Sequence, residues 1–207
     1  MDLFLKALLT FFVTVEPLGL MPLFAALAGQ DTPEERDRTA RRAVAVAAIV
    51  LLLFILGGRL VLQAFGISLE ALQIAAGAFL FLVAVDMVLA RQSGLRGTTE
   101  QETSEAMTRP DISVFPLAVP LIAGPAAITS AILLGGQAPD LPALAGVVGA
   151  AALVLAGTLA CLGVAARLTR FLGVTGVNVI NRVLGIVLGA LAVQFVLDGM
   201  RAAFPGL

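Results

Sequence analysis

The sequence of 207 residues contains no histidine, tyrosine or tryptophan, and it has a single cysteine, Cys161. Without histidine the chain lacks the commonest proton shuttle and metal ligand, so any proton chemistry has to use carboxylates. One cysteine can form neither an internal disulfide nor a thiolate metal site. No paired-carboxylate or nucleophile-and-base arrangement is found, so we expect no enzyme activity, no catalytic residue, no metal and no cofactor.

Charge is also scarce. Charged residues make up 13% of the chain, against roughly 25% in soluble proteins. The net charge is −1 and the charges lie between apolar runs, which leaves no basic surface for nucleic acid. Hydrophobic residues make up 59% of the chain, in continuous runs near the roughly 20 residues that cross a bilayer as a helix. The pattern predicts an all-α, polytopic membrane protein rather than a β-barrel, which would alternate in segments of about ten residues.

The apolar runs predict six transmembrane helices, at residues 3–28, 43–65, 69–90, 114–135, 143–166 and 179–203. Of the 13 basic residues, only Lys6, Arg59 and Arg201 fall outside three alternate loops and their flanks. The excess of arginine predicts that these loops are cytoplasmic and that both termini lie outside a bacterial or archaeal inner membrane. A signal peptide is not expected, since Glu16 and Pro17 interrupt the first apolar run.

The two halves of the chain resemble each other. FGISLEALQIAAGAFLFLVAVD at 65–86 aligns with LGVTGVNVINRVLGIVLGALAVQ at 172–194, with Gly66 opposite Gly173 and Gly77 opposite Gly185. Three spans per half predicts two repeats of inverted topology, with a site at their interface near the membrane midplane. The first repeat is 1–90, a cytoplasmic linker is 91–113 and the second repeat is 114–207. The alternative is chance similarity between apolar segments.

Each predicted repeat begins with a helix that prolines interrupt. TVEPLGLMPLF at 14–24 contains Pro17 and Pro22, and FPLAVPLIAGPAAI at 115–128 contains Pro120 and Pro125. A proline removes one N–H and displaces the carbonyl four residues earlier, and in lipid such groups need another partner. We expect half-helices to begin near Pro22 and Pro125 and to direct their positive N-terminal ends at each other, where a carboxylate can bind.

Glu16 is the acidic residue nearest the centre of a predicted span. An ionised carboxylate there costs roughly 2.5–3.5 kcal/mol or more, so it either serves a substrate ammonium group or coupling cation, or caps the break as a neutral group. Small residues around the breaks admit only compact substrates, although such residues are also typical of close helix packing. The predicted substrate-binding residues are Thr14, Glu16, Pro17, Gly19, Pro22, Pro120, Ala123, Gly124, Pro125 and Gln194.

Other polar residues have simpler interpretations. Asn178, Asn181 and Arg182 form a second group of candidates, for which a helix N-cap is the alternative. Gln194 either lines the site or bonds a neighbouring helix. Asp86 and Asp198 are expected at solvated span ends, and Arg59 is expected to extend to the membrane surface. Gly185 and Gly189 are predicted to pack helices closely.

At these motifs the chain resembles the MarC family (UPF0056) of six-span inner-membrane proteins. The resemblance rests on EPLGLMPLF at 16–24, FGIS at 65–68, AAGAFLFLVA at 75–84, PLAVPLIAGPAAIT at 116–129 and NRVLGIVLGALAVQFVLDG at 181–199. The family more often has Asp or Asn where Glu16 stands. The family includes small neutral amino acid transporters of the SnatA type, so the resemblance implies uptake or exchange of glycine, alanine and similar amino acids, driven by a cation gradient.

The sequence is therefore compatible with three functional hypotheses. The first is a secondary transporter of small neutral amino acids that works by alternating access, with H⁺ or Na⁺ as the coupling cation. The second is an exporter of another small metabolite, or a family member without amino acid transport. The third is a purely structural membrane protein. For the first two, the expected partners are a small-molecule substrate and the lipid bilayer.

Overall fold

The computed structural model describes residues 3–29, 31–89 and 111–204; for 166–175, 177 and 178 it describes the backbone alone. Within these ranges the regular structure is helical and no strand occurs, which confirms an all-α protein. The elements are α1 (Leu3–Val15), α2 (Pro17–Leu27), α3 (Pro33–Ala64), α4 (Leu69–Leu89), η1 (Ser113–Ile122), α6 (Pro125–Gln137) and α7 (Leu141–Ala203). The predicted linker lies mostly outside the described residues.

By length and composition, five helical segments in the described chain can cross a membrane. They are Leu3–Leu27, Pro33–Ala64, Leu69–Leu89, Leu141–Ala165 and Val179–Ala203. A sixth candidate is the pair of η1 and α6, which is bent by 60° across a short break. The six segments correspond to the six predicted spans, and the chain is a multi-pass membrane protein.

α3 begins ten residues before the predicted span, because its start is set by capping rather than by hydrophobicity. Thr32 Oγ1 accepts from the N–H of Glu35 at 3.3 Å, and the Glu35 carboxylate accepts from the N–H of Thr32 at 2.8 Å. This capping box and Pro33 at the first helical position fix the start of the helix. The polar first turns of α3 therefore extend the helix beyond the apolar run.

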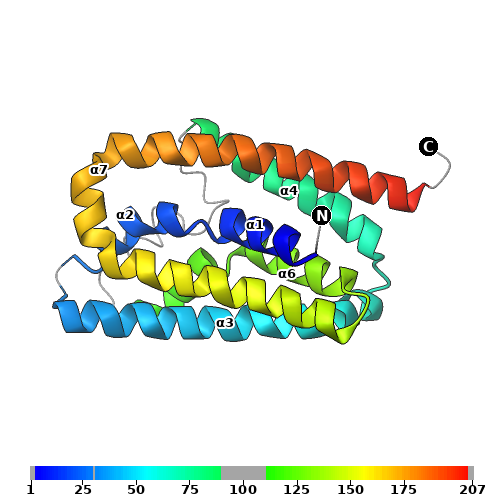
Figure 1. Ribbon diagram of the computed structural model, residues 1–207, viewed down its shortest axis with the longest axis horizontal. Coiled ribbons are helices and arrows are strands. Elements are labelled where there is room, and N and C mark those ends of the chain that lie inside the picture. The colour runs from blue at the N-terminus through cyan, green and yellow to red at the C-terminus, as the bar shows by residue number, and fades with distance from the viewer. Residues whose placement is uncertain (1–2, 30, 90–110, 205–207) are drawn as a thin grey trace.

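The fifth and sixth spans are parts of one helical stretch, α7, whose path reverses between them (Figure 1). The spans predicted at 143–166 and 179–203 imply a loop between them, and that prediction is wrong, because the backbone stays helical through 166–178. No proline lies in this segment to end the helix. The N-cap interpretation of Asn178 and Asn181 is wrong for the same reason, since both residues lie inside α7.

The bundle has two distinct ends (Figure 1). The start of α1 and the end of α7 lie toward one of them, together with the turn between α3 and α4, and we call it the terminal end. The other end carries the connection between α2 and α3 and a series of arginines in the first turns of α3, and we call it the arginine-rich end; these arginines are Arg36, Arg38, Arg41 and Arg42.

Glycines allow two pairs of helices to approach closely. A Cβ atom added at Gly77 of α4 would lie 2.6 Å from the carbonyl oxygen of Ala192 in α7, and one at Gly185 would lie 2.7 Å from Met87 Cβ. A Cβ atom at Gly135 of α6 would collide with the backbone oxygen of Ile55 in α3. The predicted close packing at Gly185 is confirmed, and at these glycines α4 lies close against α7 and α6 lies close against α3.

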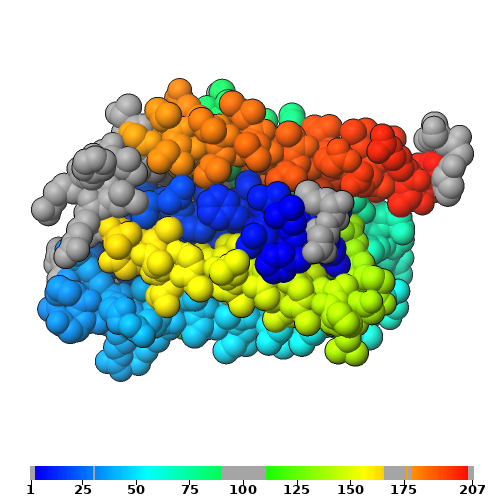
Figure 2. Space-filling model, in the orientation of Figure 1, coloured from blue at the N-terminus to red at the C-terminus, as the bar shows by residue number. Residues whose placement is uncertain are grey.

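The apolar side chains form two clusters. One joins α1, α2, α3, η1, α6 and the first span of α7. The other joins α4 to the last span of α7 and includes Val13 of α1 and Leu133 of α6. α1 packs against α7, and on the face in Figure 2 it lies between the two spans of that helix. α1 is thus flanked by both spans of α7, and its side chains at Leu5, Leu9 and Phe12 remain exposed.

Candidate functional site

The first break lies between α1 and α2 at Glu16, whose backbone is left-handed (φ 54°, ψ 59°). This conformation costs a non-glycine residue on the order of 1–3 kcal/mol and marks a position held by its surroundings. Pro17 follows at the first position of α2, where its missing N–H is no loss. The first intrahelical bond of α2 runs from the N–H of Leu20 to the oxygen of Glu16 at 3.2 Å. The N–H groups of Leu18 and Gly19 therefore precede the helical ladder.

The Glu16 side chain folds back over the start of α2. It is only 9% exposed, and a Cβ atom at Gly19 would lie 2.6 Å from its Oε1. Gly19 therefore leaves the space that the carboxylate occupies. The positive N-terminal end of α2 favours a negative charge at this place.

The second break follows η1, which is an irregular segment. Phe115 and Val119 are extended, with φ near −130°, and both precede prolines with cis peptide bonds, Pro116 and Pro120. A residue before proline is driven away from the helical region. Backbone hydrogen bonds then span five residues, as from Ala123 N–H to Ala118 O at 2.8 Å. α6 begins at Pro125, and its first bond joins Ile128 N–H to Gly124 O at 2.9 Å.

The two breaks share one local pattern: a non-helical residue and then a proline at the first helical position. The pattern pairs Glu16-Pro17 with Gly124-Pro125. The prediction that a half-helix begins near Pro22 is wrong, because Pro22 lies inside α2. Gly124 leaves no room for a side chain, since a Cβ atom would lie 2.6 Å from the carbonyl oxygen of Pro120. One break therefore carries a carboxylate and the other carries none.

The breaks divide the two spans into four arms. α1 and α6 lie on the terminal-end side of their breaks, and α2 and η1 lie on the arginine-rich side (Figure 1). α1 packs against α6, and α2 packs against η1. Because α2 and α6 start at the breaks and run in opposite directions, the positive ends of both helices face the middle of the bundle.

The remaining predicted residues are distributed between the breaks and the last span. Ala123 is fully buried, Pro17 is buried, and Pro120 is partly buried. Thr14 Oγ1 donates to the carbonyl oxygen of Thr10 at 2.9 Å within α1. In α7, exposed Gln194 donates to Asp198 of the same helix at 2.6 Å, Asn181 is partly buried and Arg182 is exposed. The side chain of Asn178 lies outside the described residues.

Two hydroxyl groups on the terminal-end arms were not predicted. Thr10 Oγ1 on α1 and Ser130 Oγ on α6 are buried, and within the described chain neither has a hydrogen-bond partner. A buried polar group without a partner costs about 1–3 kcal/mol and calls for an explanation such as a water or a ligand. An isolated Thr or Ser within an apolar helix gives no signal in the sequence, because these residues also satisfy themselves on their own backbone.

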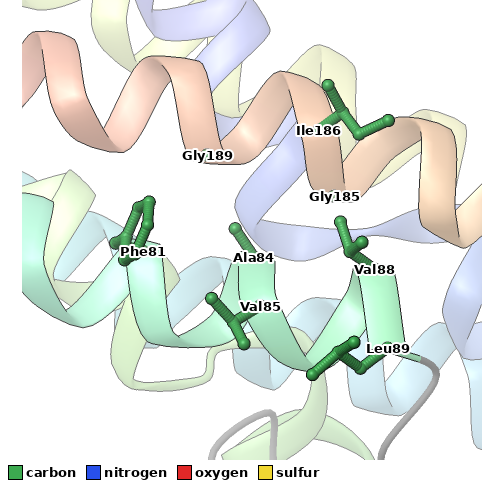
Figure 3. Close-up of a pocket in the computed structure, with 8 residues that line it drawn as sticks. All are labelled: Phe81, Ala84, Val85, Val88, Leu89, Gly185, Ile186 and Gly189. Atoms are coloured by element: carbon green, nitrogen blue, oxygen red, sulfur yellow. The ribbon is translucent and has the colours of Figure 1, made fainter.

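A separate cavity of about 350 Å³ lies between α4 and the last span of α7, and Phe81 and Ile186 are among the residues that line it (Figure 3). Its other lining residues are Ala84, Val85, Val88, Leu89, Gly185 and Gly189. No polar side chain is among them, whereas a site for a polar ligand needs a few placed polar groups. We therefore assign this cavity no part in binding a charged substrate.

A polar cluster at the terminal end links four spans. Lys6 Nζ of α1 donates to Gln137 Oε1 at the end of α6 at 3.2 Å and lies 4.0 Å from Asp198 Oδ2 of α7. Gln137 in turn donates to buried Gln73 of α4 at 3.3 Å. We call Lys6, Gln73, Gln137 and Asp198 the terminal-end cluster. The one feature of the sequence that marks this cluster is that Lys6 is the sole lysine of the chain.

Arginines hold the arms at the opposite end. Arg36 of α3 donates to the carbonyl oxygens of Ala28 and Gly29, both at 2.8 Å, and so caps the end of α2. Arg42 pairs with Asp111 at 3.5 Å, just before η1. Hydrogen bonds from the side chain and N–H of Ser113, with the charges of Arg42 and Arg38, hold the pKa of Asp111 below its usual range.

Comparison with known proteins identifies close relatives along the whole chain. The model of a family described as "MarC family integral membrane protein" matches residues 1–204. The UPF0056 membrane protein YhcE of Escherichia coli is 36% identical over 99% of this chain and 94% of its own. A UPF0056 membrane protein of Archaeoglobus fulgidus is 36% identical over 97% and 93%, and YvbG of Bacillus subtilis is 32% identical over 96% and 94%. No solved structure matches.

Proposed function

Because the chain belongs to the MarC family of integral membrane proteins, we propose that it is a secondary transporter of small neutral amino acids such as glycine and alanine. It works by alternating access in the cytoplasmic membrane of a bacterium or archaeon, and a cation gradient drives it. The relatives carry names that state no substrate. The proposal is supported mainly by one observation, the pairing of a break that carries a carboxylate with one that does not.

The proposed substrate has one charge for each break. Its ammonium group is bound beside the Glu16 carboxylate and the oxygens at the first break. Its carboxylate is bound at the start of α6, where the N–H groups of Ala126 and Ala127 precede the helical ladder and Gly124 brings no competing side chain. The buried hydroxyls of Thr10 and Ser130 provide further partners for a polar ligand. The surrounding side chains are small, and this favours glycine and alanine over larger amino acids.

The inverted repeat is part of the proposal. The two breaks lie 108 residues apart, at Pro17 and Pro125, and this offset agrees with that between Gly77 and Gly185. α3 packs on α6 and η1, while the first span of α7 shares one apolar cluster with α1 and α2, so the second span of each half lies beside the broken span of the other half. Such an exchange is expected of two repeats around a pseudo-two-fold axis. The arginine-rich end then faces the cytoplasm.

Uptake of labelled glycine and alanine into proteoliposomes tests the proposal. We expect saturable uptake, and we expect Glu16→Gln to reduce it at least about tenfold. A tenfold loss corresponds to about 1.4 kcal/mol of lost interaction with the ammonium group. Glu70→Gln is the matched control, because it removes a carboxylate from the first turn of α4, away from the breaks. Equal uptake by the two variants would exclude Glu16 from the site.

A competition panel identifies the substrate class. Amino acids from glycine to leucine should inhibit the uptake of labelled alanine, and the inhibition should weaken as the side chain becomes larger. A transported compound that no amino acid displaces would assign the chain to the export of a different small metabolite.

A further inference from the structure

We propose that the terminal-end cluster is a gate, closed in this structure, and that the Lys6–Asp198 pair with the Lys6–Gln137 hydrogen bond is the contact that opens. The inference rests on the proposed transport function, because a gate requires a path. It assigns a role to the sole lysine of the chain, which the binding site does not use.

The cluster joins the two terminal-side arms to the neighbouring pair of helices. Lys6 belongs to α1 and Gln137 to α6, the two arms on the terminal side of the breaks. Gln73 and Asp198 belong to α4 and α7, whose backbones meet closely at Gly77 and Gly185. One ammonium group thus connects both arms to the helix pair beside them. Movement of either arm away from α4 and α7 has to break these contacts.

The cluster is well separated from the first break along α1. Lys6 lies ten residues before Glu16 in α1, which is about 15 Å along a helix. The buried hydroxyl of Thr10 lies one turn from Lys6 toward the break, on the same face. The cluster at the terminal end therefore lies on one side of the proposed site, with Thr10 between Lys6 and Glu16 along α1.

The Lys6–Asp198 contact is strong enough to hold the arms and weak enough to open. The side chains of Lys6 and Asp198 are 22% and 34% exposed, so water competes for both charges. The ring of Phe195 lies 5.6 Å from Lys6 Nζ and adds a cation–π contact. A fully buried ion pair would be costly to separate, whereas a partly exposed one exchanges its partner for water.

The opposite end provides a comparison. Arg36 and Arg42 of α3 hold the ends of α2 and η1, the arms on the other side of the breaks. If the site opens to one side at a time, loss of the terminal-end cluster should favour the state open at the terminal end and disfavour the state open at the arginine-rich end. A merely local loosening around Lys6 would instead change the accessibility of the residues near Lys6 and leave the arginine-rich end unchanged.

Thiol reactivity measures both sides without a substrate. Cys161 is replaced by alanine, and a reporter is placed behind the gate by Thr10→Cys or on the other side by Val119→Cys. A membrane-impermeant methanethiosulfonate is then applied to vesicles of either orientation. We expect K6Q and D198N to raise the rate of modification of T10C about three- to fivefold, which is the size of effect that loss of one partly exposed ion pair can have. Both substitutions should lower the rate of modification of V119C. R59Q, which removes a charge from exposed Arg59 of α3, should change neither.

The charge exchange K6E/D198K restores an ion pair and should return T10C to its slow rate. The proposal is overturned if T10C reacts in K6Q as in R59Q, if T10C accelerates while V119C is unchanged, or if the exchanged pair reacts as fast as K6Q. Amino acid uptake by the protein without reporters separates this result from the proposed function. If the thiol reactivity shifts but no amino acid is taken up, the gate is supported and the proposed substrate is refuted. If uptake is normal and the thiol reactivity does not shift, the gate is refuted.

Discussion

Gly19→Ala tests how the first break positions Glu16. The new Cβ atom would lie 2.6 Å from Oε1 and 2.7 Å from Cδ of Glu16, whereas ordinary contacts begin at 3.4 Å. The carboxylate therefore has to retreat by about 0.8 Å. Displacements near 1 Å in a binding constellation can cost about 100-fold, and we expect at least a tenfold loss of uptake because the side chain can partly adjust.

Stability should change little in this variant. The group that has to move is the far end of a flexible side chain, and alanine is better than glycine inside a helix by roughly 1 kcal/mol. We expect the melting temperature to stay within about 2–4 °C, which is what roughly 1 kcal/mol shifts in a chain of this size. Loss of uptake with an unchanged melting temperature would separate a displaced carboxylate from a damaged fold.

The assay is initial uptake of labelled alanine into proteoliposomes, with thermal unfolding of the same preparations. Gly157→Ala is the matched control, since no atom lies within 4 Å of its added Cβ. G19A should also be non-additive with E16Q, because both act on one carboxylate. Uptake by G19A equal to that of G157A, or additive losses in the double variant, would refute the reasoning.

Two further predictions concern stability. Gly77→Ala places a Cβ atom 2.6 Å from the backbone oxygen of Ala192, which cannot move alone. We therefore expect α4 and α7 to separate, at a cost of about 1–3 kcal/mol in the free energy of unfolding. Gly149→Ala is the control and should leave the melting temperature unchanged, because no atom lies within 4 Å of its added Cβ. Asp111→Asn should lower the melting temperature slightly at pH 7. Because the pKa of Asp111 is depressed in the folded state, its contribution is present above the ordinary value of about 3.9 and is lost as the pH falls through the lower folded value. The difference between wild type and D111N should therefore shrink as the pH falls below about 3.9, and a difference that stays constant as the pH falls would contradict the assignment.

The spans were predictable because lipid imposes a simple requirement on length and hydrophobicity. The start of α3 at Pro33 follows from a different sequence signal, an N-cap threonine with a proline and a glutamate in the first turn, and not from hydrophobicity. The helical connection at 166–178 was missed because the gap between two predicted spans implied a loop, although the arginines in it are also good helix formers.

The first break was predicted as a region, but the proline that starts the half-helix was not. Pro17 and Pro22 look alike in sequence, and both can end a helix. What distinguishes them is the left-handed backbone of Glu16 and the space above Gly19, which are properties of the packed bundle. The terminal-end cluster escaped prediction for a related reason. Lys6, Gln73, Gln137 and Asp198 are far apart in the sequence, and only the packing of α1, α4, α6 and α7 brings them together.

The breaks also have a consequence for how the chain enters the bilayer. α1 has 13 residues and α2 has 11, so they measure about 20 and 17 Å, and neither alone crosses a core of about 30 Å. During synthesis they have to be inserted as one segment, with Glu16 at its centre. The apolar residues on both sides offset the cost of that carboxylate, at roughly 0.3–0.6 kcal/mol each. The first span is thus committed to the membrane before the helices that surround Glu16 in the finished protein have been made.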